Sequence, residues 1–483
     1  MLVVTSYILL LSRGKLEWGG SAPDKKTLGV VKDNAQRSME QSCTGVVITP
    51  LGTWLVGHRE ESLSEIKIAS GVKNLAQLLE PDVPKKGDTP RGPSSAGIGG
   101  LIGLGQERDE VSVISRLNPG GVFEPVAVVP ETACLRATPD GQRVFLLTGL
   151  KQPEKSDSNG ASGPQSQTVV FESNDQGATW QWRKQGFFPQ KYLAWDIQPY
   201  FFNTRSVWVW TDEPGLELDP SAQPEITTLQ YSPDGGNTIE TVRSARPLVV
   251  PFEEIRAKVP DNARWGDNAD SSGRVSSHIV QFSDQRAVAW VSQEFLYSLD
   301  DGPYLHIPYS ITTQATLERV AGQWQVGKVS RIEGFAIKQI LGSKAGQALA
   351  VVQRASQPTA TIETFDPTRL QWEKRGELPN AFAPLHGSSY VREAYLGSKA
   401  LVVNVGSTHE VPRLIYPWRR DAANVSGDAV FYSTDLGRSW SRLAIDGYLG
   451  LLGMDEVQNR VIWAEENRYS NRSLQVHSYG LSP

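Results

Sequence analysis

The stretch FESNDQGATW, residues 171–180, decides the fold. After an apolar start it places polar, glycine and aromatic residues at alternate or adjacent positions, namely Ser173, Asp175, Gly177, Thr179 and Trp180. In a turn, an aspartate accepts hydrogen bonds from backbone N–H groups, a hydroxyl bonds locally, and a glycine supplies a positive φ. A tryptophan can pack beneath such a turn. All these roles are local, so the stretch predicts a structural turn between two strands and not a catalytic site.

The same pattern recurs along the chain. SPDGGNTI (232–239) keeps Ser232, Asp234, Gly236 and Thr238. STDLGRSW (433–440) keeps Ser433, Asp435, Gly437, Ser439 and Trp440. A worn copy, SLDDGPYL (298–305), keeps Ser298, Asp300 and Gly302, and a distant copy without the glycine, TFDPTRLQW, begins at residue 364. The five copies start at residues 173, 232, 298, 364 and 433, and such even spacing indicates a repeat protein.

Short strand-like runs surround each copy and define the repeat. TVVFES (168–173) and AVFYS (429–433) precede their turns, and further runs with β-branched residues lie upstream. Four short strands in each unit predict an all-β fold, a β-propeller of four-stranded antiparallel blades. Residues 45–57 begin an additional unit before the five copies and the C-terminal segment forms another, which gives seven blades, with six as the alternative. We expect an N-terminal strand to pair with the last blade, because closure removes sheet edges.

Composition limits the function classes. The chain has 483 residues and a formal net charge of -5, so a nucleic-acid partner is not expected. It has two cysteines, Cys43 and Cys134, which either form one disulfide or stay as two buried thiols. Residues 1–12 are apolar and resemble part of an export signal or membrane anchor, with a buried first strand as the alternative. We therefore expect a signal-like segment and linker at 1–40 and one propeller domain at 41–483, located outside the cytoplasm.

Interruptions of the repeat are where we look for function. A proline- and glycine-rich insert occupies residues 80–110, and its GIGGLIGLG lacks the Gly-Lys-Ser/Thr of a phosphate loop. Oxygen-rich residues 261–274 could hold calcium, but no metal or cofactor is expected. Aromatic and arginine side chains are enriched at binding hot spots. On that basis the candidate partner-binding residues are Trp265, Arg274, Tyr390, Arg392, Arg413, Trp418, Arg419 and Arg420.

The recurring turns resemble the Asp-box, or BNR, repeats of the sialidase-like β-propeller superfamily. In that family the boxes lie on the face opposite the active site, which implies a structural role for them here. Exo-sialidases carry the first arginine of a carboxylate-binding trio in an Arg-Ile-Pro motif just before a strand like GVVITPLGTWLVG (45–57). Here SCT, residues 42–44, precedes that strand, so the arginine is missing and sialidase activity is not expected.

The resemblance implies a non-catalytic member of the superfamily. We expect an exported or membrane-tethered binding protein that recognises a protein partner, or alternatively a glycan, through its loop face. A bacterial assembly factor and a toxin-neutralising, immunity-type protein are the two roles that fit. No obligate homo-oligomer is expected. The alternative is a glycoside hydrolase of the sialidase-like class that uses two carboxylates, whose separation a sequence does not give.

Overall fold

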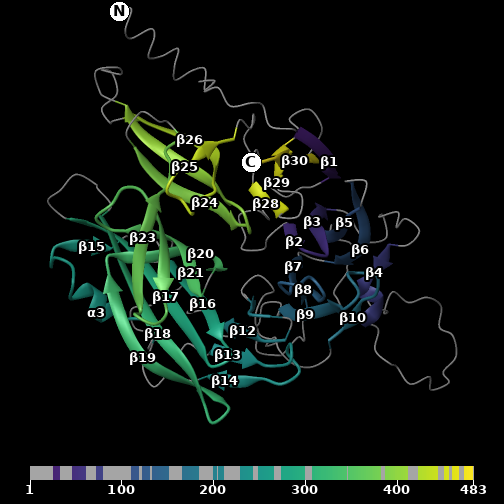
Figure 1. Cartoon of the computed structure of the whole chain (residues 1–483), viewed down its shortest axis with the longest axis horizontal. Coiled ribbons are helices and arrows are strands. Elements are labelled where there is room, and N and C mark those ends of the chain that lie inside the picture. The colour runs from purple at the N-terminus through teal and green to yellow at the C-terminus, as the bar shows by residue number, and fades with distance from the viewer. Residues whose placement is uncertain are drawn as a thin grey trace, which may run out of the picture. The chain divides into compact units, whose positions relative to one another are not determined.

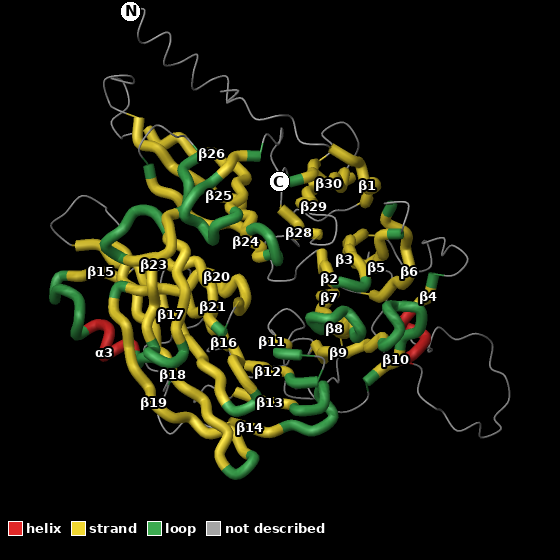
Figure 2. The backbone as a smooth tube through the Cα atoms, in the orientation of Figure 1, coloured by secondary structure: helices red, strands yellow, loops and turns green. Residues whose placement is uncertain are grey.

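The structure is a computed structural model of the whole chain, and it is nearly all β. It describes residues 25–32, 46–60, 72–79, 110–118, 122–130, 133–151, 166–183, 199–203, 205–210, 229–242, 248–265, 274–299, 307–344, 346–381, 387–411, 423–443, 451–455, 460–466 and 473–481. Within these ranges the strands form seven small sheets, so the predicted fold class, a seven-bladed β-propeller, is confirmed. Strands account for nearly all of the regular structure, as Figure 2 shows.

The sheets follow one another along the chain (Figure 1). The first contains β2 (Val46–Thr49), β3 (Gly52–Glu60), β5 (Glu110–Leu117), β6 (Phe123–Pro130) and β4 (Lys73–Asn74). The second contains β7 (Ala133–Ala137), β8 (Val144–Lys151), β9 (Ser166–Ser173) and β10 (Gln181–Trp182). The third contains β11 (Pro199–Phe201), β12 (Val207–Trp210), β13 (Leu229–Ser232) and β14 (Glu240–Val242). The fourth contains β15 (Ala263–Trp265), β16 (Arg274–Ser283), β17 (Arg286–Leu299), β18 (Ile307–Val320) and β19 (Gln323–Glu333).

The remaining sheets have four strands each. The fifth contains β20 (Phe335–Lys344), β21 (Gln347–Arg354), β22 (Thr361–Asp366) and β23 (Gln371–Glu377). The sixth contains β24 (Ser388–Leu396), β25 (Leu401–Val411), β26 (Ala423–Ser433) and β27 (Ser441–Arg442). The seventh contains β28 (Leu451–Asp455), β29 (Arg460–Glu466), β30 (Ser473–Gly480) and β1 (Lys25–Lys32). Because β1 pairs with β30, the expected pairing of an N-terminal strand with the last sheet is found.

Two sheets depart from the four-stranded antiparallel pattern. In the first sheet the short strand β4 pairs with β6 in parallel, and the 3-10 helix η1 (Leu75–Leu79) follows it. In the fourth sheet, β15 pairs with the far end of β17, which has 14 residues. The helix α3 (Phe252–Arg256) precedes β15. These additions enlarge two of the seven repeats.

Apolar clusters fill the space between consecutive sheets. Trp54 of β3 and Trp180 after β9 belong to the cluster between the first and second sheets. Trp208 of β12 joins the third and fourth sheets, with its ring centroid 4.9 Å from that of Trp324 in β19. Two further clusters join the fifth sheet to the sixth and the sixth to the seventh. Strands whose sheet is buried on both faces carry near-continuous apolar runs, as VWVW in β12 does.

The chain divides into two compact units. One comprises Thr27–Glu333 and Ala464–His477, and the other comprises Met1–Lys26, Gly334–Trp463 and Ser478–Pro483. The predicted boundary between a segment 1–40 and a domain 41–483 stays a prediction, although β1 lies within the first of these. The apolar residues 1–12 and, apart from Glu110, the insert at 80–110 lie outside the described residues. Of the described helices, none is long and apolar enough to cross a membrane.

Candidate functional site

The three well-matched repeats form closed hydrogen-bonded turns between the third and fourth strands of their sheets. We call these three segments, starting at Ser173, Ser232 and Ser433, the Ser-Asp-Gly turns. In the last of them the Ser433 hydroxyl donates to Asp435 Oδ1 at 2.7 Å and accepts the Gly437 N–H at 2.7 Å. The other two turns repeat both contacts. Each serine is buried, and its hydroxyl is satisfied by hydrogen bonds within its own turn.

The aspartates of these turns accept hydrogen bonds from residues of their own turns. Asp435 Oδ2 accepts the Ser439 hydroxyl at 2.6 Å, and Oδ1 accepts the Ser439 N–H at 2.9 Å. These bonds, led by the one from the Ser439 hydroxyl, lower the pKa of Asp435 to about 2. Hydrogen bonds from Thr179 likewise lower the pKa of Asp175. Each carboxylate is therefore held ionised by its own turn.

The turn glycines do more than supply a positive φ, because they touch the preceding sheet. Gly177 has a φ of 84°, and a Cβ built on it would lie 2.4 Å from Cη2 of Trp54 in the first sheet. Gly437 has a φ of 92°, and its Cβ would lie 2.9 Å from Ile362 in the fifth sheet. The missing side chain thus allows each turn to contact its neighbour. The sequence pattern indicated the φ but not this contact.

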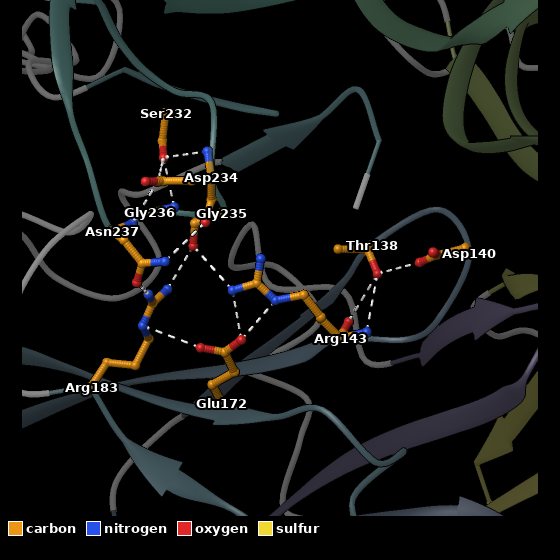
Figure 3. A network of polar contacts seen from close by, with 10 residues as sticks. All are labelled: Thr138, Asp140, Arg143, Glu172, Arg183, Ser232, Asp234, Gly235, Gly236 and Asn237. Carbon is orange, nitrogen blue, oxygen red and sulfur yellow. Dashed lines mark hydrogen bonds and ion pairs between the residues drawn. The ribbon is translucent and has the colours of Figure 1, made fainter. Parts of the chain in front are cut away.

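The turn of the third sheet contacts the second sheet through polar groups (Figure 3). The side chain of Glu172 is buried, the residue being 7% exposed. Its carboxylate accepts a hydrogen bond from Arg143 Nε at 2.7 Å and forms an ion pair with Arg183 Nε at 3.2 Å. Both guanidinium groups also donate to the carbonyl oxygen of Gly235, at 3.2 Å from Arg143 and 2.7 Å from Arg183. A buried carboxylate paired with two arginines therefore holds the third sheet's turn. Neither arginine was a candidate in the sequence, because nothing local links them to a turn 50 or more residues away.

The two weaker copies of the repeat differ. Asp300 and Gly302 lie outside the described residues, as do the residues up to 306, while Ser298 lies in β17. In the distant copy, Asp366 Oδ1 accepts the Thr368 N–H at 2.8 Å, and Leu370 takes a φ of 57°. An aspartate turn thus forms there without the glycine.

The structure separates the candidate partner-binding residues. Trp265 lies in an aromatic cluster, with its ring centroid 5.1 Å from Phe252 and 5.6 Å from Tyr297, so it packs the enlarged fourth sheet. The backbone of Arg274 pairs with Glu294 at the start of β16. Four further candidates lie outside the described residues, in the connection between β25 and β26: Arg413, Trp418, Arg419 and Arg420.

Tyr390 and Arg392 are brought together with a carboxylate that the sequence reading missed. Arg392 Nε donates to Asp428 Oδ1 at 2.7 Å, and its Nη2 lies 3.4 Å from the Tyr390 hydroxyl. The guanidinium carbon is 5.7 Å from the centre of the Tyr390 ring, which suits a cation–π contact. Tyr390 is 40% exposed. We call Tyr390, Arg392 and Asp428 the Tyr390 cluster.

Backbone geometry explains this grouping. The register of β24 against β25 shifts between Val391 and Glu393, so Arg392 is the extra residue of a β-bulge. Tyr390 pairs with Gly406, and Gly406 pairs in turn with Asp428 of β26. Tyrosine, glycine and aspartate therefore lie side by side in one row across the sheet, and the glycine has no side chain between the other two. A Cβ on Gly406 would lie 2.4 Å from the Tyr390 ring, so the ring lies on that glycine.

A second carboxyl, Glu393, borders the cluster. It lies opposite Asn404 in the sheet register, and Asn404 Nδ2 donates to Glu393 Oε2 at 2.6 Å. Burial raises the pKa of Glu393, and the charge of Asp428 adds to the rise, against the lowering effects of the Asn404 hydrogen bond and of Arg392. Within the described residues, no group of three or more histidine, cysteine, aspartate or glutamate side chains could hold a metal ion.

Comparison with known proteins leaves the activity open. No protein-family profile matches the sequence, and no curated protein matches it. Among solved structures, a GH74 xyloglucanase from Xanthomonas campestris is 11% identical, with a TM-score of 0.36 over 76% of this chain. This chain spans about half, 52%, of that enzyme's length. An α-L-arabinofuranosidase from Fusarium graminearum is 10% identical, with a TM-score of 0.32, 67% of this chain and 89% of that one being covered.

A third structure is a protease domain. The β-propeller domain of the Trilobed protease from Pyrococcus furiosus is 8% identical, with a TM-score of 0.40, covering 91% of this chain and 94% of that chain. Matches at these values assign no activity to the chain.

Gly177→Ala should destabilise the protein by at least about 2 kcal/mol, from the positive φ and from the clash with Trp54 together. Gly322 is the matched control, since its φ is 85° and nothing lies within 4 Å of its added Cβ. Gly322→Ala should therefore show the backbone cost alone. Thermal unfolding of the two variants measures the difference. Equal losses would mean that the contact with the preceding sheet contributes nothing.

Asp435→Asn should lower the thermal stability at neutral pH, because an amide nitrogen cannot accept the Ser439 hydroxyl. The depressed pKa of Asp435 contributes stability that is present above the pKa of an unfolded aspartate, about 3.9. That contribution is lost as the pH falls through about 2. The unfolding temperatures of wild type and variant should therefore converge as the pH is lowered from 6 to 2. A constant difference would show that Asp435 is not held ionised by its turn.

Proposed function

We propose that this chain is a non-catalytic, extracytoplasmic binding propeller of the Asp-box, sialidase-like kind, which recognises a protein partner. The observation that carries the proposal is the Tyr390 cluster. Tyrosine and arginine are enriched at interface hot spots, and here both are exposed and already held in place by Asp428 and Gly406. Side chains fixed before binding lose little conformational freedom on association.

The remaining candidate residues lie in the sequence between two strands of the sheet that carries the cluster. The paired strands β25 and β26 end at Val411 and begin at Ala423, and these two residues face each other. Residues 412–422, which connect them, contain Arg413, Trp418, Arg419 and Arg420. Tyr390 and Asp428 lie between that end and the Ser-Asp-Gly turn at the other. The four remaining candidates thus belong to the connection that joins β25 and β26, the strands that carry Gly406 and Asp428.

The cysteines support an extracytoplasmic location. Cys134 of β7 is 1% exposed and disulfide-bonded, and Cys43 is the only other cysteine of the chain. Disulfides persist in secreted and periplasmic proteins and are rare in the cytosol. Together with the apolar residues 1–12, this favours an exported or membrane-tethered protein. An assembly factor or a toxin-neutralising, immunity-type protein of bacteria would have this location and a protein partner.

The test is isolation of a complex from cells that produce the protein. A tagged wild-type chain should yield a complex of fixed stoichiometry by gel filtration and mass spectrometry. Tyr390→Ala with Arg392→Ala should weaken that complex by roughly 30-fold or more, the effect of losing about 2 kcal/mol at a hot spot. Arg319→Ala is the matched control, since Arg319 lies over the Tyr231 ring at the same 5.7 Å in another sheet. Equal weakening by both changes would refute the assignment of the surface.

One observation favours a glycoside hydrolase as the second candidate. Burial raises the pKa of Glu393, which lies near Asp428, and a protonated acid beside a second carboxyl group is the arrangement that two-carboxylate hydrolysis uses. Against it, Asp428 is engaged by Arg392 and Glu393 by Asn404.

An assay with a panel of fluorogenic aryl glycosides decides between the two functions. We expect wild type to release no more fluorophore than a mock preparation. Release that disappears in both Glu393→Gln and Asp428→Asn, while Glu373→Gln retains it, would replace the binding proposal with an enzymatic one. Glu373 is suitable as the control because its side chain is 69% exposed, in a different sheet.

A further inference from the structure

Glu393 and Asn404 form an isolated polar pair beneath the Tyr390 cluster. Asn404 is 2% exposed, and its side chain emerges from the central strand β25 on the same face as Gly406. Its Nδ2 donates to Glu393 Oε2 at 2.6 Å, which brings the amide and carboxyl groups together. This is the one hydrogen bond of Glu393's carboxyl found among the described residues. The pair therefore has unused hydrogen-bonding capacity.

The unused capacity includes a buried acceptor. Asn404 Oδ1 is inaccessible to solvent and has no hydrogen-bond partner among the described residues. Leaving such a buried oxygen without a hydrogen bond is unfavourable, and most buried polar groups in native structures have a partner. An ionised Glu393 cannot relieve this, because a carboxylate only accepts hydrogen bonds.

We infer that Glu393 carries a proton in the folded protein at pH values where exposed glutamates are ionised, and that it donates this proton to Asn404 Oδ1. A carboxylic acid and a primary amide can exchange two hydrogen bonds at once. The amide N–H donates to one carboxyl oxygen, as the 2.6 Å contact already shows, and the acid O–H donates to the amide oxygen. Protonation thus satisfies the one buried acceptor that ionisation leaves without a partner.

The surrounding groups act on Glu393 in both directions. Asp428 of β26 disfavours its ionisation, and Arg392 of β24 favours it, but the Arg392 guanidinium is already bonded to Asp428. Tyr395 of β24 donates a hydrogen bond to the carbonyl of Leu451 in β28 at 3.5 Å, and burial raises the pKa of Tyr395, so this phenol stays neutral. Burial is the largest effect on Glu393 itself and raises its pKa. Burial therefore raises the pKa of Glu393 against the lowering effects of Arg392 and of the donated Asn404 N–H, and the unsatisfied Asn404 Oδ1 favours the same protonated state.

This proton regulates the proposed binding surface, an extension that rests on the proposed function. With Glu393 neutral, Arg392 and Asp428 form a balanced pair next to Tyr390. When Glu393 ionises, Arg392 faces two carboxylates and the surface gains a negative charge. A partner that binds Arg392 through an acidic group should therefore bind more weakly as the pH rises through the pKa of Glu393.

Glu393→Gln provides the test, because glutamine reproduces the protonated pair. Its amide N–H can donate to Asn404 Oδ1 and its oxygen can accept from Nδ2 at every pH. A carboxyl whose folded pKa is raised stabilises the fold less as the pH increases. Wild type and Glu393→Gln should therefore unfold at the same temperature at pH 4, and the variant should become more stable than wild type as the pH rises from the pKa of an unfolded glutamate, about 4.3, to the raised pKa of Glu393, with a constant difference above it.

A spectroscopic measurement makes the test specific. In protein labelled with 13C at the glutamate carboxyl, infrared difference spectra of wild type against Glu393→Gln should show a protonated carboxyl band that persists above the titration of the other glutamates. Glu373→Gln, which removes an exposed carboxyl, should give no such band and no pH-dependent gain in stability. Both measurements need only the full chain, so their outcome is independent of whether a partner is captured.

Two results would overturn the inference. One is a Glu393 carboxyl that titrates together with the exposed glutamates. The other is a Glu393→Gln variant whose difference in unfolding temperature from wild type does not change with pH. Once a complex is isolated, its affinity should vary with pH in wild type and lose that part of the variation in Glu393→Gln.

Discussion

The contact of each Ser-Asp-Gly turn with the preceding sheet is the interaction on which the rest of the structure depends. At Gly177 it is an aromatic ring against bare backbone, at Gly437 an isoleucine against bare backbone, and at Gly235 a carbonyl held by two arginines. In each case the hairpin end of one sheet lies against a side chain that belongs to the sheet before it. Small sheets of four strands have little core of their own, so contacts between successive sheets must supply their stability.

The hydrogen bonds inside the turn make this contact possible. A glycine at positive φ costs the chain conformational entropy, and a loop that fluctuated would not hold its backbone against a ring at van der Waals distance. The aspartate and the serine fix the loop by bonding its N–H groups, and the low pKa of Asp435 is a measure of how strongly they do so. The carboxylate thus acts on the backbone of its turn, by giving it one conformation that fits the neighbouring sheet.

Much of this architecture could be predicted from the sequence, for a physical reason. The turn depends only on residues close together in the sequence, so these residues recur at fixed offsets. The spacing between copies gives the number of residues in one repeat. The parallel strand β4 and the strand β15 were not predicted, because each pairs with a distant segment and carries no pattern of its own. The same holds for Glu172 and its arginines, which meet only after two sheets have formed. Among the candidate binding residues, composition alone could not separate Trp265, which packs a local aromatic cluster, from Tyr390, which stays exposed.

In the sixth sheet the structural turn and the proposed binding surface lie apart on one scaffold. Its Ser-Asp-Gly turn begins at Ser433, at the end of β26, whereas the row that joins Tyr390, Gly406 and Asp428 crosses the same strand five residues earlier. At about 3.4 Å per residue, the two features are roughly 17 Å apart. Exposed charges at that distance are largely screened from each other at physiological salt. Substitutions around Tyr390 can therefore alter the proposed binding surface without loosening the turn that holds the sheet to its neighbour, and such a separation allows one repeated fold to support many different surfaces.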